Sequence, residues 1–415
     1  MSRSIELMAV NLSLPKAKEI LTIKGIRLAT ANAGIKKNGS SDLVLIEICK
    51  GSTVSAIYTQ NAFCAAPVTI AKLHQGEVTP RYLLVNSGNA NAGTGQQGLK
   101  TAIACCEAIA SQVNEITQAV LPFSTGVIGE QLPLDKVKGA IPGLVAALGA
   151  ERWLEAAQAI MTTDTVAKAV SKQVKLAGKL ITVTGIAKGS GMIRPDMATM
   201  LSYIATDAAI AQNILDLMLK KASAQSFNRI SVDGDTSTND ACVLMATGKA
   251  NNALLTDFDT SDSQTLYKAI AAISQQLAHA VVRDGEGATK FITVEVEQGT
   301  DTEECRQVAY TIAHSPLVKT ALFASDPNWG RILAAVGRSG LNDFDLTQVA
   351  IYLDDVCVIK NGEPAVNYTE ALGQQVMNQE EIMIRVILKR GKATDTIWTC
   401  DFSYDYVKIN AEYRT

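Results

Sequence analysis

A threonine near the middle of the chain stands where nucleophilic chemistry could begin. Thr199 lies in the run Met197-Ala-Thr-Met-Leu201, which follows the glycine-rich turn Lys188-Gly-Ser-Gly191. A threonine hydroxyl needs a base to become a nucleophile, and no histidine lies near Thr199 in the sequence. Cleavage of the chain before Thr199 would supply that base, because the freed α-amine could accept the hydroxyl proton. Thr199 is therefore a candidate N-terminal nucleophile, and the competing interpretation is an ordinary threonine buried in a β-strand.

Two other motifs resemble ligand-binding loops, and their spacing disfavours both. Gly93-Thr-Gly-Gln-Gln-Gly98 matches G-x-G-x-x-G. However, about seven residues separate it from the predicted strand Tyr82–Val85, which is too long for a dinucleotide-binding turn and favours a structural turn. The polar loop that begins at Asp233 has Thr238 where a calcium loop needs glycine, and Leu244 where it needs glutamate.

Composition favours a soluble globular protein with a substantial core. The 415 residues are 47% hydrophobic and 19% charged, enough for two or three ordinary domains or one elaborated domain. The net charge of −3 offers no basic footprint for nucleic acid, and no stretch reaches the ~20 apolar residues of a membrane span. The three histidines lack metal-ligand spacing, which disfavours a zinc enzyme.

The cysteines and the N-terminal segment bear on the compartment. None of the eight cysteines forms a Cys-x-x-Cys motif and several sit in apolar runs, so we expect buried free thiols in a reducing compartment. Residues 1–18 lack the long apolar segment of a signal peptide. These features together predict a cytoplasmic protein.

Predicted strands and helices mix without regular alternation, which indicates an α+β fold with layered sheets and helices. Apolar runs and alternation predict strands over residues 26–30, 42–49, 52–59, 82–85, 180–187, 290–297, 349–353, 382–388 and 396–402, and a strand end turning at 125–126. Helical spacing predicts helices over residues 99–109, 151–161, 208–227, 263–282 and 303–323, the last broken at Pro316. Residues 134–148 are expected to be a Gly/Ala-rich segment.

Several motifs, in order along nearly the whole chain, resemble one family: ornithine acetyltransferase, also called glutamate N-acetyltransferase, of arginine biosynthesis. The most specific combination is Lys188-Gly-Ser-Gly-Met-Ile193 followed by Met197-Ala-Thr-Met-Leu201. The other matching motifs are Asn86-Ser-Gly-Asn-Ala-Asn-Ala92, Ser124-Thr-Gly126, Met161-Thr-Thr-Asp-Thr165, Asp284-Gly-Glu-Gly-Ala-Thr-Lys290, Asp326-Pro-Asn-Trp-Gly-Arg331 and Asn410-Ala-Glu-Tyr-Arg-Thr415. Gly93 and Asp196 depart from the expected family pattern, and neither replaces a catalytic group.

The resemblance implies a precursor that cleaves itself between Ala198 and Thr199 into fragments 1–198 and 199–415, which together form one catalytic unit. It also implies a layered α/β sandwich similar to N-terminal-nucleophile hydrolases, and an assembly of cleaved protomers as an α2β2 heterotetramer. Thr199 would be the nucleophile, and Thr125 and Gly126 would form the oxyanion hole. The implied substrate-binding residues are Thr162, Lys188, Thr199, Glu286, Asn410 and Thr415.

The implied reaction is a ping-pong transfer of acetyl from N2-acetyl-L-ornithine to L-glutamate through an acetyl-enzyme, with no metal or organic cofactor. The sequence leaves open whether acetyl-CoA is also an acetyl donor, whether arginine or ornithine inhibits, and how large the oligomer is. Two rival interpretations also stay open. One is a self-cleaved amidohydrolase or aminopeptidase that uses water as the acceptor, and the other is a non-catalytic or nucleotide-binding protein that uses Gly93–Gly98.

Overall fold

The computed structural model describes residues 9–194 and 200–412. The predictions for Ala198, Thr199 and Thr415 concern residues outside this part of the chain. The described chain divides into two units, of which the larger lies within residues 13–228 and 235–281 and the smaller contains residues 9–12, 229–234 and 282–412. These two units are defined by how the chain packs, and they do not test where it is cleaved. The cleavage into fragments 1–198 and 199–415 therefore stays a prediction.

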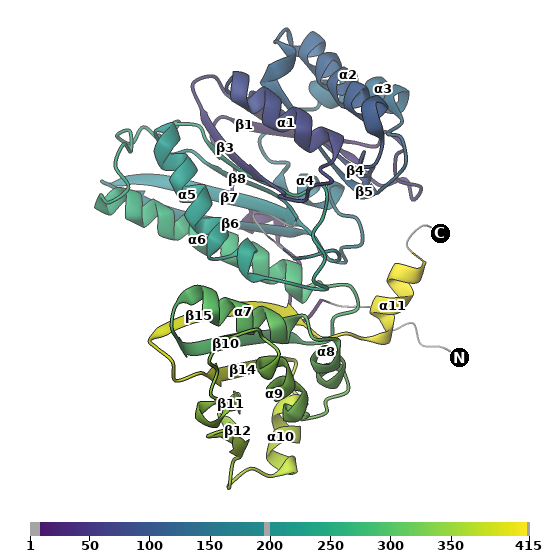
Figure 1. Cartoon of the computed structure of the whole chain (residues 1–415). Helices are drawn as coiled ribbons and strands as arrows, with labels where there is room; N and C mark the ends of the chain where they lie inside the picture. The colour runs from purple at the N-terminus through teal and green to yellow at the C-terminus, as the bar shows by residue number, and fades with distance from the viewer. Residues whose placement is uncertain (1–8, 195–199, 413–415) are drawn as a thin grey trace. The chain divides into compact units, whose positions relative to one another are not determined.

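The first sheet of the larger unit has the strand order β1-β2-β4-β5, with β4 and β5 parallel and the other neighbours antiparallel. Its strands are β1 (Ile26–Ala31), β2 (Leu43–Ile48), β4 (Tyr82–Asn89) and β5 (Val120–Val127). The aliphatic run of β2 is buried along almost its whole length, as expected for an inner strand covered on both faces. One face packs against helices α1 (Ala66–Glu77), α2 (Gly95–Val113) and α3 (Leu134–Ala146) (Figure 1).

The second sheet of the larger unit has the order β3-β9-β8-β7-β6, with β8 and β9 parallel. Its strands are β3 (Thr53–Tyr58), β6 (Lys168–Leu176), β7 (Lys179–Lys188), β8 (Leu201–Thr206) and β9 (Ala241–Ala246). Helices α5 (Gln212–Ala224) and α6 (Ser261–Arg283) cover its outer face (Figure 1). At Gly185 of β7 a Cβ would lie 3.0 Å from side-chain atoms of Ile273 and Leu277, so α6 packs closely on this strand.

The two sheets face each other across a hydrophobic core, so the larger unit has the layer order helix, sheet, sheet, helix. The rings of Phe123 from β5 and Tyr203 from β8 meet edge to face, with centroids 5.4 Å apart. Trp153 of the short helix α4 (Trp153–Ala159) is fully buried in the same core. The predicted layered α/β sandwich is confirmed.

The smaller unit is built on a mixed sheet with the order β13-β12-β11-β14-β10-β15, in which β10 and β14 run parallel. Its strands are β10 (Phe291–Gly299), β11 (Ala350–Leu353), β12 (Val356–Lys360), β13 (Glu363–Pro364), β14 (Glu381–Ile387) and β15 (Ala393–Cys400). Its helices are α7 (Thr302–Ala313), α8 (Pro316–Phe323), α9 (Trp329–Gly337), α10 (Glu370–Met377) and α11 (Tyr404–Ala411). The core lies where α7, α8 and α9 pack on β10, β11 and β14.

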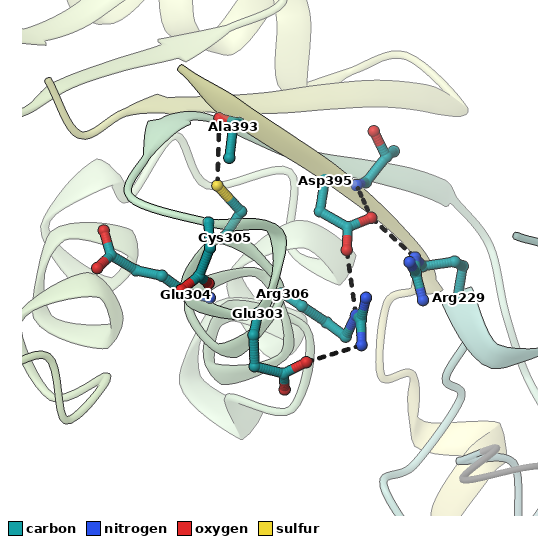
Figure 2. A network of polar contacts seen from close by, with 9 residues as sticks. Arg229, Glu303, Glu304, Cys305, Arg306, Ala393 and Asp395 are labelled. Atoms are coloured by element: carbon teal, nitrogen blue, oxygen red, sulfur yellow. Dashed lines mark hydrogen bonds and ion pairs between the residues drawn. The ribbon is translucent and has the colours of Figure 1, made fainter. Parts of the chain in front are cut away.

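A polar network in the smaller unit fixes α7 against β15 (Figure 2). Asp395 of β15 accepts from Arg229 Nε at 2.8 Å and from Arg306 Nε at 3.1 Å, and Arg306 also pairs with Glu303 at 2.8 Å. Cys305 Sγ lies 3.4 Å from the carbonyl oxygen of Ala393. Because Asp395 is largely buried, losing either arginine would leave a partly desolvated carboxylate short of a partner.

Several element predictions are confirmed and others are wrong. The break at Pro316 is confirmed, since α8 starts there, and the buried strand predicted over residues 180–187 is β7. The segment 134–148 is largely the helix α3, although Pro142 lies inside it. β4 continues to Asn89, so only residues 90–92 separate it from Gly93, and the predicted spacing of about seven residues was too long.

The predicted burial of cysteine thiols can be compared with the structure. All eight cysteines carry free thiols, and Cys105, Cys106, Cys242, Cys305 and Cys400 are buried as expected. Within residues 9–194 and 200–412, no helix combines the length and the apolar character needed to cross a membrane.

Candidate active site

The predicted site residues of the larger unit gather at the end of β7 and the end of β5. Lys188 is the last residue of β7, and its Nζ donates to Thr125 Oγ1 of β5 at 3.4 Å. Both side chains are largely buried, with 9% of each residue exposed. Lys188 pairs with Leu201 in the β7–β8 ladder, and Leu201 follows Thr199 by two positions in the sequence. A buried cation therefore contacts the predicted oxyanion-hole threonine beside the start of β8.

Gly126 has a backbone conformation and surroundings that exclude a side chain. Its φ is +134°, and a Cβ would lie 2.3 Å from the carbonyl carbon of Gly88 and 2.5 Å from Asn89 N. The register of β4 and β5 shifts at this point, because Asn89 pairs with both Thr125 and Val127. This bulge ends regular pairing at the two residues predicted to hold the oxyanion. That role stays a prediction.

One buried carboxylate, Asp164, connects Thr162 with the end of β7. Its Oδ2 accepts from Thr162 N at 3.0 Å, and its Oδ1 accepts from Gly189 N at 2.7 Å. Lys168 Nζ lies 2.7 Å from the same Oδ1, and neither side chain of this ion pair is exposed. Asp164 thus links the backbone of Thr162 to that of Gly189, the residue after Lys188. That Thr162 and Lys188 bind substrate stays a prediction.

A second buried acid, Asp240, precedes β9 beside the start of β8. Ala241 N donates to the carbonyl oxygen of Met200 at 2.9 Å, which places Asp240 next to the residue that follows Thr199 in sequence. Burial raises the pKa of the Asp240 carboxyl well above its ordinary value, despite hydrogen bonds from Ser237 and the charge of Lys188. Its Oδ2 has no hydrogen-bond partner among the described residues. Burial and the missing partner of Oδ2 both favour the neutral form of this acid.

The loop before β9 is tied to the first sheet of the larger unit by a side-chain amide. Asn239 Nδ2 donates to the carbonyl oxygens of Ala90 at 2.6 Å and Ser124 at 2.9 Å. Ser124 Oγ in turn donates to Asn86 Oδ1. These bonds fix the residue before Thr125 relative to the loop that carries Asp240.

Asp164, Asn239 and Asp240 were not singled out from the sequence. Asp164 lies inside the quoted motif Met161–Thr165, and the other two lie in the loop that was weighed only as a calcium loop. The sequence did offer one signal for Asp240, which was its position along the chain. Asp240 directly precedes the wholly buried strand Ala241–Ala246, and a charged residue there needs a partner or a proton.

The smaller unit brings two other predicted residues together. Asn410 Nδ2 of α11 donates to Glu286 Oε2 at 2.8 Å. The Glu286 loop can lie against the start of α11 because Gly287 has φ +69° and no side chain. A Cβ there would lie 2.6 Å from Ser403 Oγ and Tyr406 N. Glu286 is 6% exposed, so its carboxylate is held in a defined position.

The glycine-rich motif Gly93–Gly98 spans the turn before α2 and the first residues of this helix, which begins at Gly95. A Cβ at Gly98 would lie 1.8 Å from Thr94 Oγ1, which itself donates to Asn91 Oδ1 at 2.8 Å. Asn91 Nδ2 closes the turn on the carbonyl oxygen of Gly98 at 3.0 Å. Gly98 is thus explained by the close approach of the Thr94 and Asn91 side chains, which favours the structural interpretation of this motif.

Comparisons with known proteins agree with the motifs. The model of the ArgJ family matches residues 27–415. The arginine biosynthesis bifunctional protein ArgJ of Methylococcus capsulatus is 56% identical over 393 residues, which are 95% of this chain and 96% of that protein.

Two solved structures are also similar to parts of the chain. ArgJ from Bacillus halodurans is 42% identical over 51% of this chain and 99% of that chain, with a TM-score of 0.49. Ornithine acetyltransferase from Mycobacterium tuberculosis, solved with ornithine, is 34% identical over 45% of this chain and 99% of that chain, with a TM-score of 0.39.

The motif resemblance and the family match together define an acyltransferase with a layered α/β fold. The chain belongs to the ArgJ family, so the family predicted from the sequence motifs is confirmed.

Proposed function

We propose that the chain transfers the acetyl group of N2-acetyl-L-ornithine to L-glutamate in arginine biosynthesis, with Thr199 as the nucleophile of a ping-pong reaction. Membership of the ArgJ family supports the reaction class. The observation that carries the proposal is the contact of Lys188 Nζ with Thr125 Oγ1 beside the start of β8. In this contact, the Lys188 ammonium, which would bind the substrate carboxylate, meets the Thr125 hydroxyl, which would donate to the acetyl carbonyl oxygen.

The first step is self-cleavage. Thr199 Oγ attacks the carbonyl carbon of Ala198, the C–N bond breaks, and the acyl group moves to Oγ as an ester while the nitrogen takes a proton. Water then opens the ester and leaves a carboxylate on Ala198 and a free hydroxyl and α-amine on Thr199. The amine, with an ordinary pKa near 8, can act as a base, whereas the amide nitrogen it replaces cannot.

The second step is acetyl transfer. Thr199 Oγ attacks the acetyl carbonyl carbon as its proton passes to the α-amine, and Thr125 and Gly126 stabilise the negative charge on the carbonyl oxygen. The C–N bond to ornithine then breaks, and the leaving amine takes the proton. Glutamate's amine attacks the acetyl ester in the same way and leaves as N-acetylglutamate. Loss of one oxyanion donor typically lowers the rate by ~10²–10³.

Charge supports the assignment of substrate groups. The ammonium of Lys188 suits the carboxylate that acetylornithine and glutamate share, and Thr162 adds a hydroxyl donor. The carboxylate of Glu286, which Asn410 orients, suits the second amine of ornithine. Thr415 completes the proposed binding set. The reaction needs no metal or organic cofactor because the N-terminal amine supplies the base.

Three finer properties belong to the same proposal. The word "bifunctional" in the name of the Methylococcus relative supports acetyl-CoA as a second acetyl donor to glutamate. We also propose an α2β2 assembly of cleaved protomers and a cytoplasmic location. Enzyme incubated with acetyl-CoA and glutamate should form N-acetylglutamate, and dialysis against EDTA should leave the acetylornithine reaction unchanged.

The decisive experiment is the intact mass of the purified protein together with its products. Two fragments, the second beginning at Thr199, replace the 44.1 kDa chain. Thr199→Ala should abolish both the cleavage and the transfer. A persistent intact chain with full activity, or activity in Thr199→Ala, would contradict Thr199 as the nucleophile.

Product analysis separates the transferase from the hydrolase. With acetylornithine and glutamate present, the transferase forms N-acetylglutamate in proportion to the ornithine released. Free acetate as the main product, independent of glutamate, would instead establish the amidohydrolase.

A further inference from the structure

Asp164 is a buried carboxylate to which the proposed reaction assigns no step. Its two oxygens accept three hydrogen bonds, from Lys168 Nζ at 2.7 Å, Gly189 N at 2.7 Å and Thr162 N at 3.0 Å. Residues 162–168 follow α4, and Gly189 follows β7, so one side chain joins two segments that are distant in the sequence. Two of the three donors belong to Thr162 and to the neighbour of Lys188.

The carboxylate stays charged although it is buried. Burial by itself would raise the pKa of Asp164, but the ammonium groups of Lys168 and Lys188, with hydrogen bonds from Lys168 and Thr162, hold it well below its ordinary range. A fixed negative charge therefore faces the two lysines. Charge-assisted bonds of this kind are shorter and stronger than neutral ones, so they hold the backbone groups firmly.

Fixing Gly189 N also fixes the direction of Lys188. The two residues are adjacent, and the Lys188 ammonium reaches Thr125 Oγ1 at 3.4 Å, close to the limit of a hydrogen bond. A small displacement at the end of β7 would break this contact. Misplacement of a binding group by about 1 Å can cost ~10²-fold in rate.

We propose that Asp164 is a positioning residue for recognition of the substrate carboxylate, because it holds Thr162 and the end of β7 so that Lys188 meets that carboxylate. This inference rests on the proposed function. It extends that function to a residue to which the proposed reaction assigns no step, and it predicts that Asp164 acts through Lys188.

The same strand provides a matched control. Asp207 is a buried carboxylate whose Oδ1 accepts from Thr182 N at 2.8 Å, near the opposite end of β7. Asp164→Asn and Asp207→Asn therefore remove the same charge from bonds to the backbone in the region of one strand, and only the first lies beside Lys188.

The test compares steady-state kinetics of wild type, Asp164→Asn, Asp207→Asn, Lys188→Met and the double variant Asp164→Asn/Lys188→Met. We expect Asp164→Asn to raise KM for acetylornithine and for glutamate about 10- to 100-fold, the range for lost bonds to a charged group. Asp207→Asn should leave both KM values within about twofold. In the Lys188→Met background, Asp164→Asn should add less than about threefold, because the two residues act as one unit.

A direct measurement of acetylornithine binding separates an effect of Asp164 on substrate binding from an effect on the chemical step. The rise in melting temperature with acetylornithine should be smaller in Asp164→Asn than in wild type. If Asp164→Asn does not fold, Asp164→Asn/Lys168→Met removes both charges of the ion pair and takes its place. Unchanged KM and ligand response, an equal effect of Asp207→Asn, or full multiplication with Lys188→Met would each overturn the inference. Wild-type enzyme that binds acetylornithine without transferring acetyl would instead refute the proposed function.

Discussion

Asp164 and Asp240 are both buried in the larger unit, and the positive charge of Lys188 lowers the pKa of each. The pKa of Asp164 is nevertheless lowered from its ordinary value, whereas that of Asp240 is raised. Burial opposes ionisation of each. Asp164 overcomes it with an ion pair to Lys168 and two backbone N–H donors, whereas Asp240 has Ser237 and an Oδ2 without a partner among the described residues. The comparison teaches that a directly paired ammonium, more than the depth of burial, decides in which direction the pKa of an acid at this site is displaced.

The largest effect should follow removal of the ionised acid. Asp164→Ala removes the carboxylate from its buried ion pair with Lys168, and breaking such a pair costs about 3–5 kcal/mol of unfolding free energy. Urea denaturation in the uncleaved Thr199→Ala background measures this loss as a single-chain transition. A loss below about 1 kcal/mol would mean that the ion pair contributes little, and the contrast between the two acids would fail.

The pH dependence of stability should separate the two acids by sign. Asp164 has a lowered folded pKa, so its contribution is present above the unfolded value near 4 and is lost as pH falls through the folded pKa. Asp240 has a raised folded pKa, so its contribution is present below about 4 and is lost as pH rises through the folded pKa. Each group contributes a slope of at most about 1.4 kcal/mol per pH unit.

Denaturation of wild type, Asp164→Asn and Asp240→Asn between pH 3 and 8 tests these signs. The stability difference between wild type and Asp164→Asn should shrink below about pH 4, and Asp240→Asn should decline less steeply than wild type above pH 4. The same slope in wild type and Asp240→Asn above pH 4 would show that Asp240 ionises normally.

The smallest effect, and the most distinctive, is expected for Asp240→Asn at pH 7.5. Because burial favours the protonated form of Asp240, a neutral amide in its place should raise the unfolding free energy at pH 7.5, where each unit of pKa difference between folded and unfolded states corresponds to about 1.4 kcal/mol. Asp207→Asn serves as the reference for replacing a buried carboxyl. Destabilisation of Asp240→Asn beyond that of Asp207→Asn would indicate that Asp240 is ionised in the folded state.

Local hydrophobic patterns in the sequence were enough to predict many of the strands and helices. The continuous apolar run of β7 and the alternation of β10 were recognised because burial on two faces or one face leaves a direct trace in the sequence. β6 was missed because Ser171, Lys172 and Gln173 make this edge strand polar, and α1 because Pro67 at its start resembles a turn.

The site was predictable in its parts and not in its electrostatics. Lys188 and Thr125 could be named from motifs, but their contact joins residues 63 positions apart. The lowered pKa of Asp164 depends in part on the charge of Lys188, its hydrogen bond from Gly189 N joins residues 25 positions apart, and the bulge at Gly126 depends on Gly88 in another strand. Such effects arise only when the sheets assemble, so no local pattern carries them.

The strand order of the second sheet has a consequence for refolding. β8 and β9 follow the proposed cleavage point and lie between β3 and β7, which precede it, with six paired residues on each side. A cleaved protein could lose neither fragment without opening the sheet, so dissociation and unfolding would be one event. After denaturation, the uncleaved precursor would refold at a rate independent of concentration, whereas the fragments would first have to meet in solution. After self-cleavage, the native structure would therefore persist chiefly because it unfolds slowly, and no longer because unfolding is readily reversed.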